Sequence, residues 1–309
     1  MAHVHWGVIA ATSGIYRHAL RPAMALAAMH EVTAEASRQD GDDSPYAELL
    51  RRHDVDAVYI PLPNSAHKKW IIRALEAGKH VLCEKPLTLS AADTVEVFAV
   101  AAMNDRVLME AYMWPHHPRA RRVLELVHSG AIGDVLSVRS VFTYPASDPT
   151  DHRFDERGAG ALFDVGIYCI APAMMIAGRD HRAVAAIALR NEIGVDLSMT
   201  GFVDWGDGLG GSFDVSFQAP QRRSLEVTGS NGILTLPGHH SPGSERESEI
   251  VIDRRDGSRE VILVAGANAF VGMIEHFAML IDGEEPPVFG ETQSIRLAHT
   301  LDALHAVSR

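Results

Sequence analysis

The sequence contains only two cysteines, Cys83 and Cys169, among its 309 residues. Two thiols cannot build a disulfide framework, and we interpret both as small fillers of buried positions. The chain has no apolar run of the roughly 18 residues that cross a bilayer. Its first six residues also lack the basic and apolar regions of a signal peptide. We therefore expect a cytoplasmic protein with no membrane-bound segment.

Positive charge is scarce as well. Lys and Arg total 28 against 40 Asp and Glu, which gives a net charge of −12. Binders of nucleic acids or anionic membranes need basic surfaces, so neither partner is expected. Histidine is frequent, with 17 residues, but the adjacent pairs His116-His117 and His239-His240 do not have the i,i+4 spacing of a helical metal site. We predict no metal and interpret the histidines as surface residues.

The length and the order of the predicted elements indicate two domains. Strand and helix patterns alternate from the N-terminus to about Pro118, which is typical of a doubly wound parallel sheet. Beyond it, seven strand candidates follow one another between residues 183 and 264, and two helices end the chain. We predict an α/β protein with a Rossmann-type domain at 1–118. Residues 119–309 are predicted to form an α+β domain for substrate binding and oligomerisation, with a large open, mostly antiparallel sheet.

The first strand and its turn resemble a dinucleotide-binding unit that has lost most of its glycines. A strand ending at Ala10 leads into a turn of small residues and then into a helix predicted for 15–29. In such units the turn lets a pyrophosphate approach the N-terminus of the helix. Small residues still allow this approach, and two hydroxyl groups are available for phosphate. The predicted cofactor contacts are Ala10, Thr12, Ser13, Gly14 and Ile15.

The second strand, predicted for 31–37, ends in Ser37-Arg38. An NAD-binding unit usually carries Asp or Glu here for the ribose 2′-hydroxyl, whereas Ser-Arg suits a 2′-phosphate. This favours NADP over NAD. The alternative is that Arg38 is an ordinary surface arginine, since Asp40, Asp42 and Asp43 follow it closely.

The stretch from His80 to Leu87 predicts a reactive lysine. Its apolar strand ends abruptly in Glu84-Lys85-Pro86, and Pro86 cannot continue a strand ladder. Ligands bind at the carboxyl ends of parallel strands. Lys85 is therefore expected above a ligand-binding crevice. The alternative is a Glu-Lys pair in solvent on an edge strand.

A second group of polar residues follows the loop at 145–155. Asp164 and Tyr168 are four apart in a predicted helix and should share a face. Gly158 and Gly160, just before them, would allow the start of that helix to approach another backbone or a ligand. The alternative is a structural hydrogen bond between Asp164 and Tyr168.

These motifs together resemble the Gfo/Idh/MocA family of nicotinamide-dependent oxidoreductases. Within it, the chain is similar to the branch of dimeric dihydrodiol dehydrogenase, xylose dehydrogenase and glucose-fructose oxidoreductase. The matching stretches cover most of the chain. They are 6–9, 55–67, 83–86, 110–113, 129–133 and 160–168.

The resemblance implies hydride transfer between the nicotinamide and a hydroxyl or carbonyl carbon of a sugar, polyol or cyclic diol. It implies that Lys85 and Tyr168 are the acid–base residues and that Asp164 binds the substrate or orients them. Which of Lys85 and Tyr168 carries the proton stays open. The resemblance also implies a homodimer or homotetramer formed through the C-terminal sheet. The further cofactor contacts that it implies are Pro61, Leu62, Asn64, His67, Glu84, Lys85 and Trp114.

Three departures from the family pattern support a competing hypothesis. The phosphate turn lacks its glycines, the segment after Arg38 is short, and Pro115 stands where the nearest relatives usually carry an arginine. An idle family member that binds a nucleotide or a sugar as a sensor or partner protein would tolerate such changes.

Overall fold

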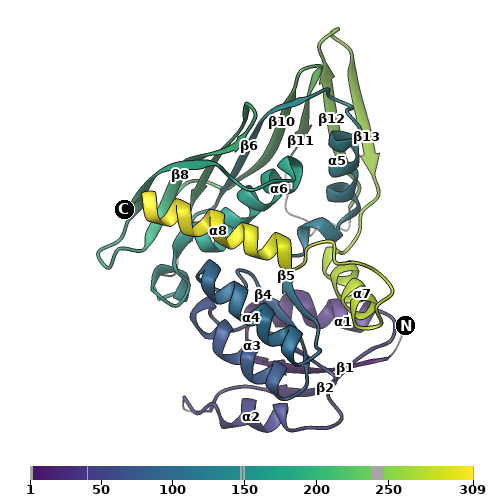
Figure 1. The fold of residues 1–309 in the computed structure, drawn as a ribbon, viewed down its shortest axis with the longest axis vertical. Helices are drawn as coiled ribbons and strands as arrows, with labels where there is room; N and C mark the ends of the chain where they lie inside the picture. The colour runs from purple at the N-terminus through teal and green to yellow at the C-terminus, as the bar shows by residue number, and fades with distance from the viewer. Residues whose placement is uncertain (1–2, 40, 147, 149, 238–245, 309) are drawn as a thin grey trace. The chain divides into compact units, whose positions relative to one another are not determined.

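The computed structural model describes residues 3–39, 41–146, 148, 150–237 and 246–308. The chain divides into two compact units, which Figure 1 draws as ribbons. The first unit consists of Met1–His116 and Asn268–Ile295, and the second of His117–Ala267 and Arg296–Arg309. The first break lies beside the predicted boundary at 118. The return of Asn268–Ile295 to the first unit was not predicted.

The first unit contains a parallel sheet of five strands in the order β2-β1-β3-β4-β5. This is the doubly wound arrangement that the sequence predicts. Beside the sheet lie the helices α3 and α4, which pack against each other (Figure 1). The strands are β1 (Val4–Ile9), β2 (His30–Ala36), β3 (Ala57–Ile60), β4 (His80–Glu84) and β5 (Leu108–Ala111). The helices are η1 (Tyr16–Leu20), α1 (Arg21–Leu26), α2 (Ser44–Leu50), η2 (Asn64–Ala66), α3 (His67–Glu76), α4 (Ala91–Met103), η3 (Trp114–His116) and α7 (Ala269–Ile281).

The segment Asn268–Ile295 belongs to the first unit because it completes the apolar core of that unit. Phe277 on α7 packs its ring 5.3 Å from that of Trp6, and Phe289 packs 5.0 Å from Tyr112. All four rings are buried. Such contacts join residues far apart in the chain, so sequence periodicity does not reveal them.

Local signals account for several boundaries. Ser90 caps α4 by accepting a hydrogen bond from the Asp93 amide at 3.1 Å, and Gly78 follows α3 with a φ of 75°. The helix predicted for 15–29 is shorter and begins as a π-helical turn, with α1 ending at Leu26. The segment after Arg38 holds the short helix α2, whose Tyr46 and Leu49 are buried.

The second unit contains a sheet of eight strands in the order β13-β12-β11-β10-β6-β9-β8-β7. Its pairs are antiparallel except for β6 and β9, which run parallel. The helix α6 packs on β6 and β9. The strands are β6 (Val135–Thr143), β7 (Ala183–Arg190), β8 (Asp196–Gly206), β9 (Leu209–Ser216), β10 (Arg222–Gly229), β11 (Gly232–Leu236), β12 (Ser248–Arg254) and β13 (Arg259–Val264). The helices are α5 (Pro118–His128), η4 (His152–Phe154), η5 (Leu162–Gly166) and α6 (Ile167–Ala177). The last helix, α8 (Glu291–Val307), begins in the first unit and belongs to the second from Arg296 on.

Candidate functional site

The turn after β1 has the conformation of a glycine turn without the glycine. Ala10 has a φ of 60°, in the left-handed region where glycine is favoured. The turn is closed by a hydrogen bond from the Ser13 amide to the Ala10 carbonyl at 2.9 Å. The hydroxyl of Ser13 accepts from the Tyr16 amide at 3.4 Å and so supports the start of η1. Gly14 and Ile15 are exposed beside it.

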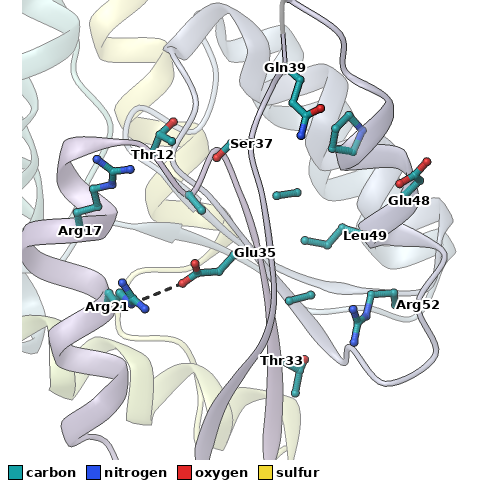
Figure 2. A pocket seen from close by; sticks show the side chains of 14 residues that line it. Thr12, Arg17, Arg21, Thr33, Glu35, Ser37, Gln39, Glu48, Leu49 and Arg52 are labelled. Carbon is teal, nitrogen blue, oxygen red and sulfur yellow. Dashed lines mark ion pairs between the residues drawn. The ribbon is translucent and has the colours of Figure 1, made fainter.

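A cavity of about 770 Å³ opens beside this turn, at the carboxyl end of β2 (Figure 2). Thr12 and Ser37, two of the predicted cofactor contacts, line it. Arg17 and Arg21 on the helical segment also line it, and the sequence analysis had not singled them out. Arg17 and Arg21 are four residues apart, a spacing that puts both side chains on one face of a helix, and this is the signal that could have identified them. The remaining lining residues are Ala11, Thr33, Ala34, Glu35, Ala36, Gln39, Pro45, Glu48, Leu49 and Arg52.

Glu35 holds one wall of this cavity in place. Its carboxylate accepts a short hydrogen bond from the Tyr16 hydroxyl and lies 3.6 Å from the Arg21 guanidinium. Burial and the neighbouring carboxylate raise the pKa of Tyr16 well above its usual range. The phenol of Tyr16 therefore stays protonated and serves as a hydrogen-bond donor to β2.

Arg38 lies outside the wall of the cavity. Its Nε donates to Asp43 Oδ1 at 2.6 Å, and Asp43 Oδ2 also accepts from Lys69 Nζ at 2.8 Å. Hydrogen bonds from Lys69 and Arg38 hold the pKa of Asp43 below its usual range, although partial burial acts against them. A phosphate at Arg38 would compete with this carboxylate. Of the other acidic residues near Arg38, Asp40 lies outside the described residues.

Lys85 follows β4 and is half-buried. On its N-terminal side, Glu84 Oε1 accepts from the Tyr59 hydroxyl at 2.7 Å. On the other side, the carbonyl of Pro86 lies 2.8 Å from His67 Nδ1. Lys85 is therefore flanked by two fixed positions at the carboxyl edge of the parallel sheet, which is where the sequence places it.

His67 connects the two loops that follow β3 and β4. Its Nε2 lies 2.8 Å from the Leu62 carbonyl, opposite the Nδ1 contact with Pro86. The ring is fully buried, and this burial lowers the pKa of His67, while its contacts with the two backbone carbonyls act in the opposite direction. The structure thus places His67 as a residue that positions backbone, with no ring surface open to a cofactor.

The other predicted contacts on this edge differ in exposure. Asn64 is half-buried in η2. Pro61 and Leu62 are buried where β3 ends. Trp114 is only 1% exposed, so its side chain is part of the core in this structure.

Glu110 is a buried carboxyl group that the sequence analysis did not assign to the site. It lies on β5 beside the end of β4, where it pairs in register with Cys83. Its Oε1 accepts from the Leu87 amide at 3.0 Å, and its Oε2 accepts from the Ser294 hydroxyl at 2.7 Å. Burial raises the pKa of Glu110 to about 7, against the opposing effects of these hydrogen bonds and of the Lys85 charge. An acidic residue near the end of an apolar strand is the sequence signal that could have identified Glu110.

In the second unit, Asp164 is held by two residues of the preceding loop. Its Oδ2 accepts from Arg153 Nε at 2.9 Å and from the Tyr144 hydroxyl at 3.3 Å. Arg153 also binds Asp151, at 2.8 Å. Burial and the charge of Asp164 raise the pKa of Tyr144 far above its usual range. Arg153 and Tyr144 are thus parts of this group that sequence reasoning missed.

Tyr168 begins α6 and is 9% exposed. Its ring lies 5.3 Å from that of Phe142 on β6. The guanidinium of Arg223 stacks on the Phe142 ring, 4.4 Å from its centroid. The charge of Arg223 also interacts with the phenol of Tyr168.

Asp164 lies in the π-helical turn η5, whose spacing differs from the i,i+4 pattern predicted for an α-helix.

The glycines before η5 do permit a close approach, as predicted. A Cβ atom on Gly160 would lie 2.4 Å from Asp196 Oδ1, and one on Gly158 would lie 2.5 Å from the His152 carbonyl oxygen. Asp196 is fully buried and accepts from the Leu162 amide at 2.8 Å. Gly160 therefore admits a carboxylate that caps the turn carrying Asp164, and Gly158 admits the backbone of His152.

Comparison with known proteins identifies the class to which this chain belongs. Residues 9–112 match the model of the oxidoreductase family with an NAD-binding Rossmann fold, and residues 120–235 match the GFO/IDH/MocA C-terminal domain. The chain belongs to the Gfo/Idh/MocA family of oxidoreductases.

Relatives within this family are similar over nearly the whole chain. The dTDP-3,4-didehydro-2,6-dideoxy-alpha-D-glucose 3-reductase of Actinomadura kijaniata is 35% identical, over 98% of this chain and 95% of its own. The D-xylose 1-dehydrogenase (NADP(+)) 2 of Haloferax volcanii is 32% identical, over 96% and 95%. A crystal structure of a 3-ketoreductase from Actinomadura kijaniata, in complex with NADP and TDP-benzene, superposes with a TM-score of 0.90 at 32% identity and covers 99% and 98% of the two chains.

Proposed function

We propose that this protein is an NADP-dependent oxidoreductase that transfers a hydride between the nicotinamide and a hydroxyl or carbonyl carbon of a sugar. The observation that carries the proposal is the position of Lys85. It follows a parallel strand at the carboxyl edge of the sheet, with its neighbours Glu84 and Pro86 fixed by Tyr59 and His67. The NADP-bound 3-ketoreductase and the NADP(+)-dependent xylose dehydrogenase support this choice of cofactor.

The residues of the first unit are suited to the adenosine half of the cofactor. The cavity beside the β1 turn has room for an adenosine phosphate, and Thr12, Ser37, Arg17 and Arg21 supply hydroxyl and cationic groups in its wall. Arginine forks match phosphate oxygens well. Arg38 can contribute once its ion pair with Asp43 yields to a 2′-phosphate.

We propose that Lys85 and Tyr168 take part in the proton transfer of this reaction, as the family resemblance implies. The bound nicotinamide supplies or accepts the hydride. Reduction of a ketone leaves an alkoxide oxygen that must gain a proton, and oxidation of an alcohol requires the reverse. We assign this proton to Lys85 and Tyr168 and the positioning of the substrate to Asp164, which Arg153 orients through an ion pair.

The substrate class follows from the relatives. Several of them act on a dTDP-linked keto sugar, one on D-xylose and others on a trans-dihydrodiol. Sugars, nucleotide-linked sugars and cyclic diols therefore form the panel for a first screen. Each would be tested with NADPH and with NADH, in both directions.

The first prediction concerns Lys85. Lys85→Ala should lower kcat/KM at least ~100-fold, because general acid–base catalysis commonly contributes 10²–10⁴. NADPH binding, followed by quenching of tryptophan fluorescence, should survive. Lys68→Ala is the matched control: Lys68 pairs with Asp93 and Glu96 on the surface and should have no effect on turnover. Full activity in Lys85→Ala would refute the assignment.

A competing function, a nucleotide or sugar sensor, is favoured by two observations. Ala10 occupies a left-handed conformation in the phosphate turn, and Arg38 is already paired. Binding of NADPH without turnover of any member of the panel would support the sensor. Steady oxidation of NADPH by any sugar of the panel would exclude it.

A further inference from the structure

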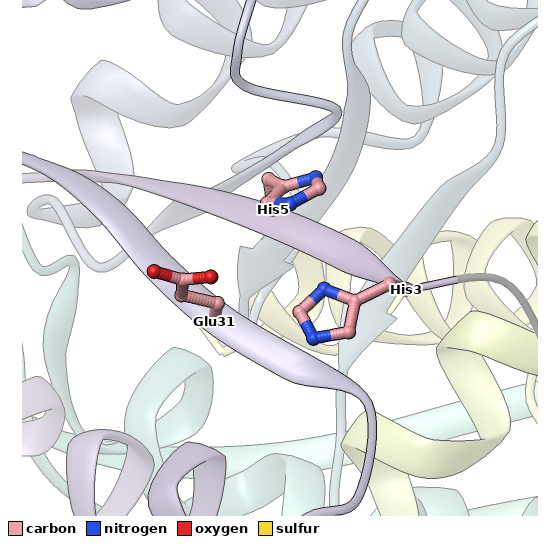
Figure 3. Close-up of side chains that lie close together, drawn as sticks. All are labelled: His3, His5 and Glu31. Atoms are coloured by element: carbon pink, nitrogen blue, oxygen red, sulfur yellow. The ribbon is translucent and has the colours of Figure 1, made fainter.

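A group of metal-ligating side chains lies at the amino-terminal edge of the parallel sheet, away from the residues assigned to catalysis. His3 and His5 belong to the first strand region, and Glu31 belongs to β2 (Figure 3). One ligand atom from each of these three side chains lies within 4.8 Å of the others. The phosphate turn follows the carboxyl end of β1 and Lys85 follows the carboxyl end of β4, so this group lies at the opposite edge of the sheet from the proposed active site.

Sheet geometry explains why these three residues meet. Side chains at i and i+2 of a strand point to the same face, which aligns His3 with His5. In the parallel register, His5 pairs with Glu31 of the neighbouring strand. The two imidazole rings lie 5.0 Å apart between centroids. The arrangement is therefore fixed by the register of β1 and β2.

A second carboxylate prepares His5 to bind a cation. His5 Nδ1 lies 2.8 Å from Asp56 Oδ2, which also accepts from the His5 amide at 3.0 Å. A carboxylate only accepts hydrogen bonds, so Nδ1 donates to Asp56, and Nε2 is the nitrogen through which His5 would bind a cation. Protein-bound metals recurrently use this carboxylate–histidine pairing, which orients the ring and raises its basicity.

We propose that His3, His5 and Glu31 form a binding site for a zinc-type divalent cation, with Asp56 as the positioning residue for His5. Two imidazoles and one carboxylate are ligands for zinc and similar transition metals, whereas Mg²⁺ and Ca²⁺ prefer oxygen alone. Ligand atoms of a tetrahedral zinc lie about 3.4 Å apart at bonds of about 2.1 Å. Rotation of His3 and Glu31, both exposed, closes the remaining gap. A fourth position stays open to water.

The role that follows is stabilisation of the strand edge. A cation held by β1 and β2 binds the folded chain and has no preformed site in the unfolded one, so it raises the melting temperature. The site lies apart from Lys85, and its occupancy should leave turnover unchanged.

The test is a calorimetric titration of the untagged, chelator-stripped full chain with ZnCl₂, repeated with CoCl₂. We expect binding that saturates at one cation per chain, and a higher melting temperature with zinc. His3→Ala and Glu31→Gln should each weaken binding at least tenfold. Asp56→Asn, which removes the carboxylate partner of His5, should weaken it by about 10- to 100-fold.

Two control variants separate this site from the other histidines. His128→Ala removes an exposed histidine elsewhere and should leave the affinity unchanged. The double variant His239→Ala/His240→Ala removes the adjacent pair, which lies outside the described residues. It should also bind zinc as the wild type does. Unchanged affinity in His3→Ala, loss of binding in the double variant, or no saturable binding at all would overturn the proposal.

Discussion

Glu110 shows how a single buried residue adjusts the neighbourhood of Lys85. Its two carboxylate oxygens accept hydrogen bonds from the Leu87 amide, just after Lys85, and from the hydroxyl of Ser294, which lies 184 residues after Glu110. Because the group is enclosed, its ionised form is disfavoured, and its pKa rises from an ordinary 4.5 to about 7. The charge next to the Lys85 loop thus changes near neutral pH.

The raised pKa of Glu110 predicts a specific dependence of stability on pH. Between about pH 4.5 and 7 the folded chain holds a proton that the unfolded chain has lost, so this contribution is present at low pH and is lost as the pH rises through 7. The difference amounts to about 3 kcal/mol at most. Glu110→Gln should remove it. Urea unfolding at pH 5, 6, 7 and 8 would measure this, and parallel pH profiles of wild type and variant would contradict it.

At the scale of elements, the turn η5 carries Asp164 and depends on its entry. Gly160 has a φ of 88° and faces the buried carboxylate of Asp196, which caps the turn through the Leu162 amide. A side chain at this position meets two obstacles at once: the backbone conformation and the lack of space.

Gly160→Ala should therefore lower the free energy of unfolding by more than ~2 kcal/mol, since it combines backbone strain with a clash against a packed group. Gly178→Ala is the matched control. Gly178 also has a positive φ, 65°, but nothing lies within 4 Å of its added Cβ. Strain alone, about 1 kcal/mol, should remain there. Denaturant midpoints of the two variants would compare them, and equal losses would show that Asp196 does not restrict the site.

At the scale of the whole molecule, one face of the eight-stranded sheet exposes large apolar side chains. Ile187 and Leu189 on β7 and Phe202 on β8 are 81%, 56% and 48% exposed. The register of β7 and β8 puts all three on one face of the sheet, and α6 packs on the sheet through β6 and β9. Among the residues that the structure describes, no helix is long and apolar enough to cross a membrane. We propose that a second copy of the chain covers this apolar face, as the expected homo-oligomer requires.

The double variant Ile187→Glu/Phe202→Glu should convert such an oligomer into monomers, because charges buried without partners are strongly unfavourable at an interface. Light scattering after size-exclusion chromatography would give the mass. Ile193→Glu is the control: it is 66% exposed but lies in the turn between β7 and β8. A monomeric wild type would reject the proposal.

The sequence determined the order of elements, because strand and helix periodicities and their caps are local properties of the chain. It predicted Lys85 at the end of a strand, which is β4, and it predicted that Gly160 lies close to another part of the chain. Only the tertiary structure decided which distant groups meet. Packing joins separate segments of the chain in four places. These are the His5–Glu31 register, the Glu110–Ser294 hydrogen bond, the Asp164–Arg153 ion pair and the return of Asn268–Ile295 to the first unit. Packing depends on side-chain volume and on the whole core, and a local pattern records neither.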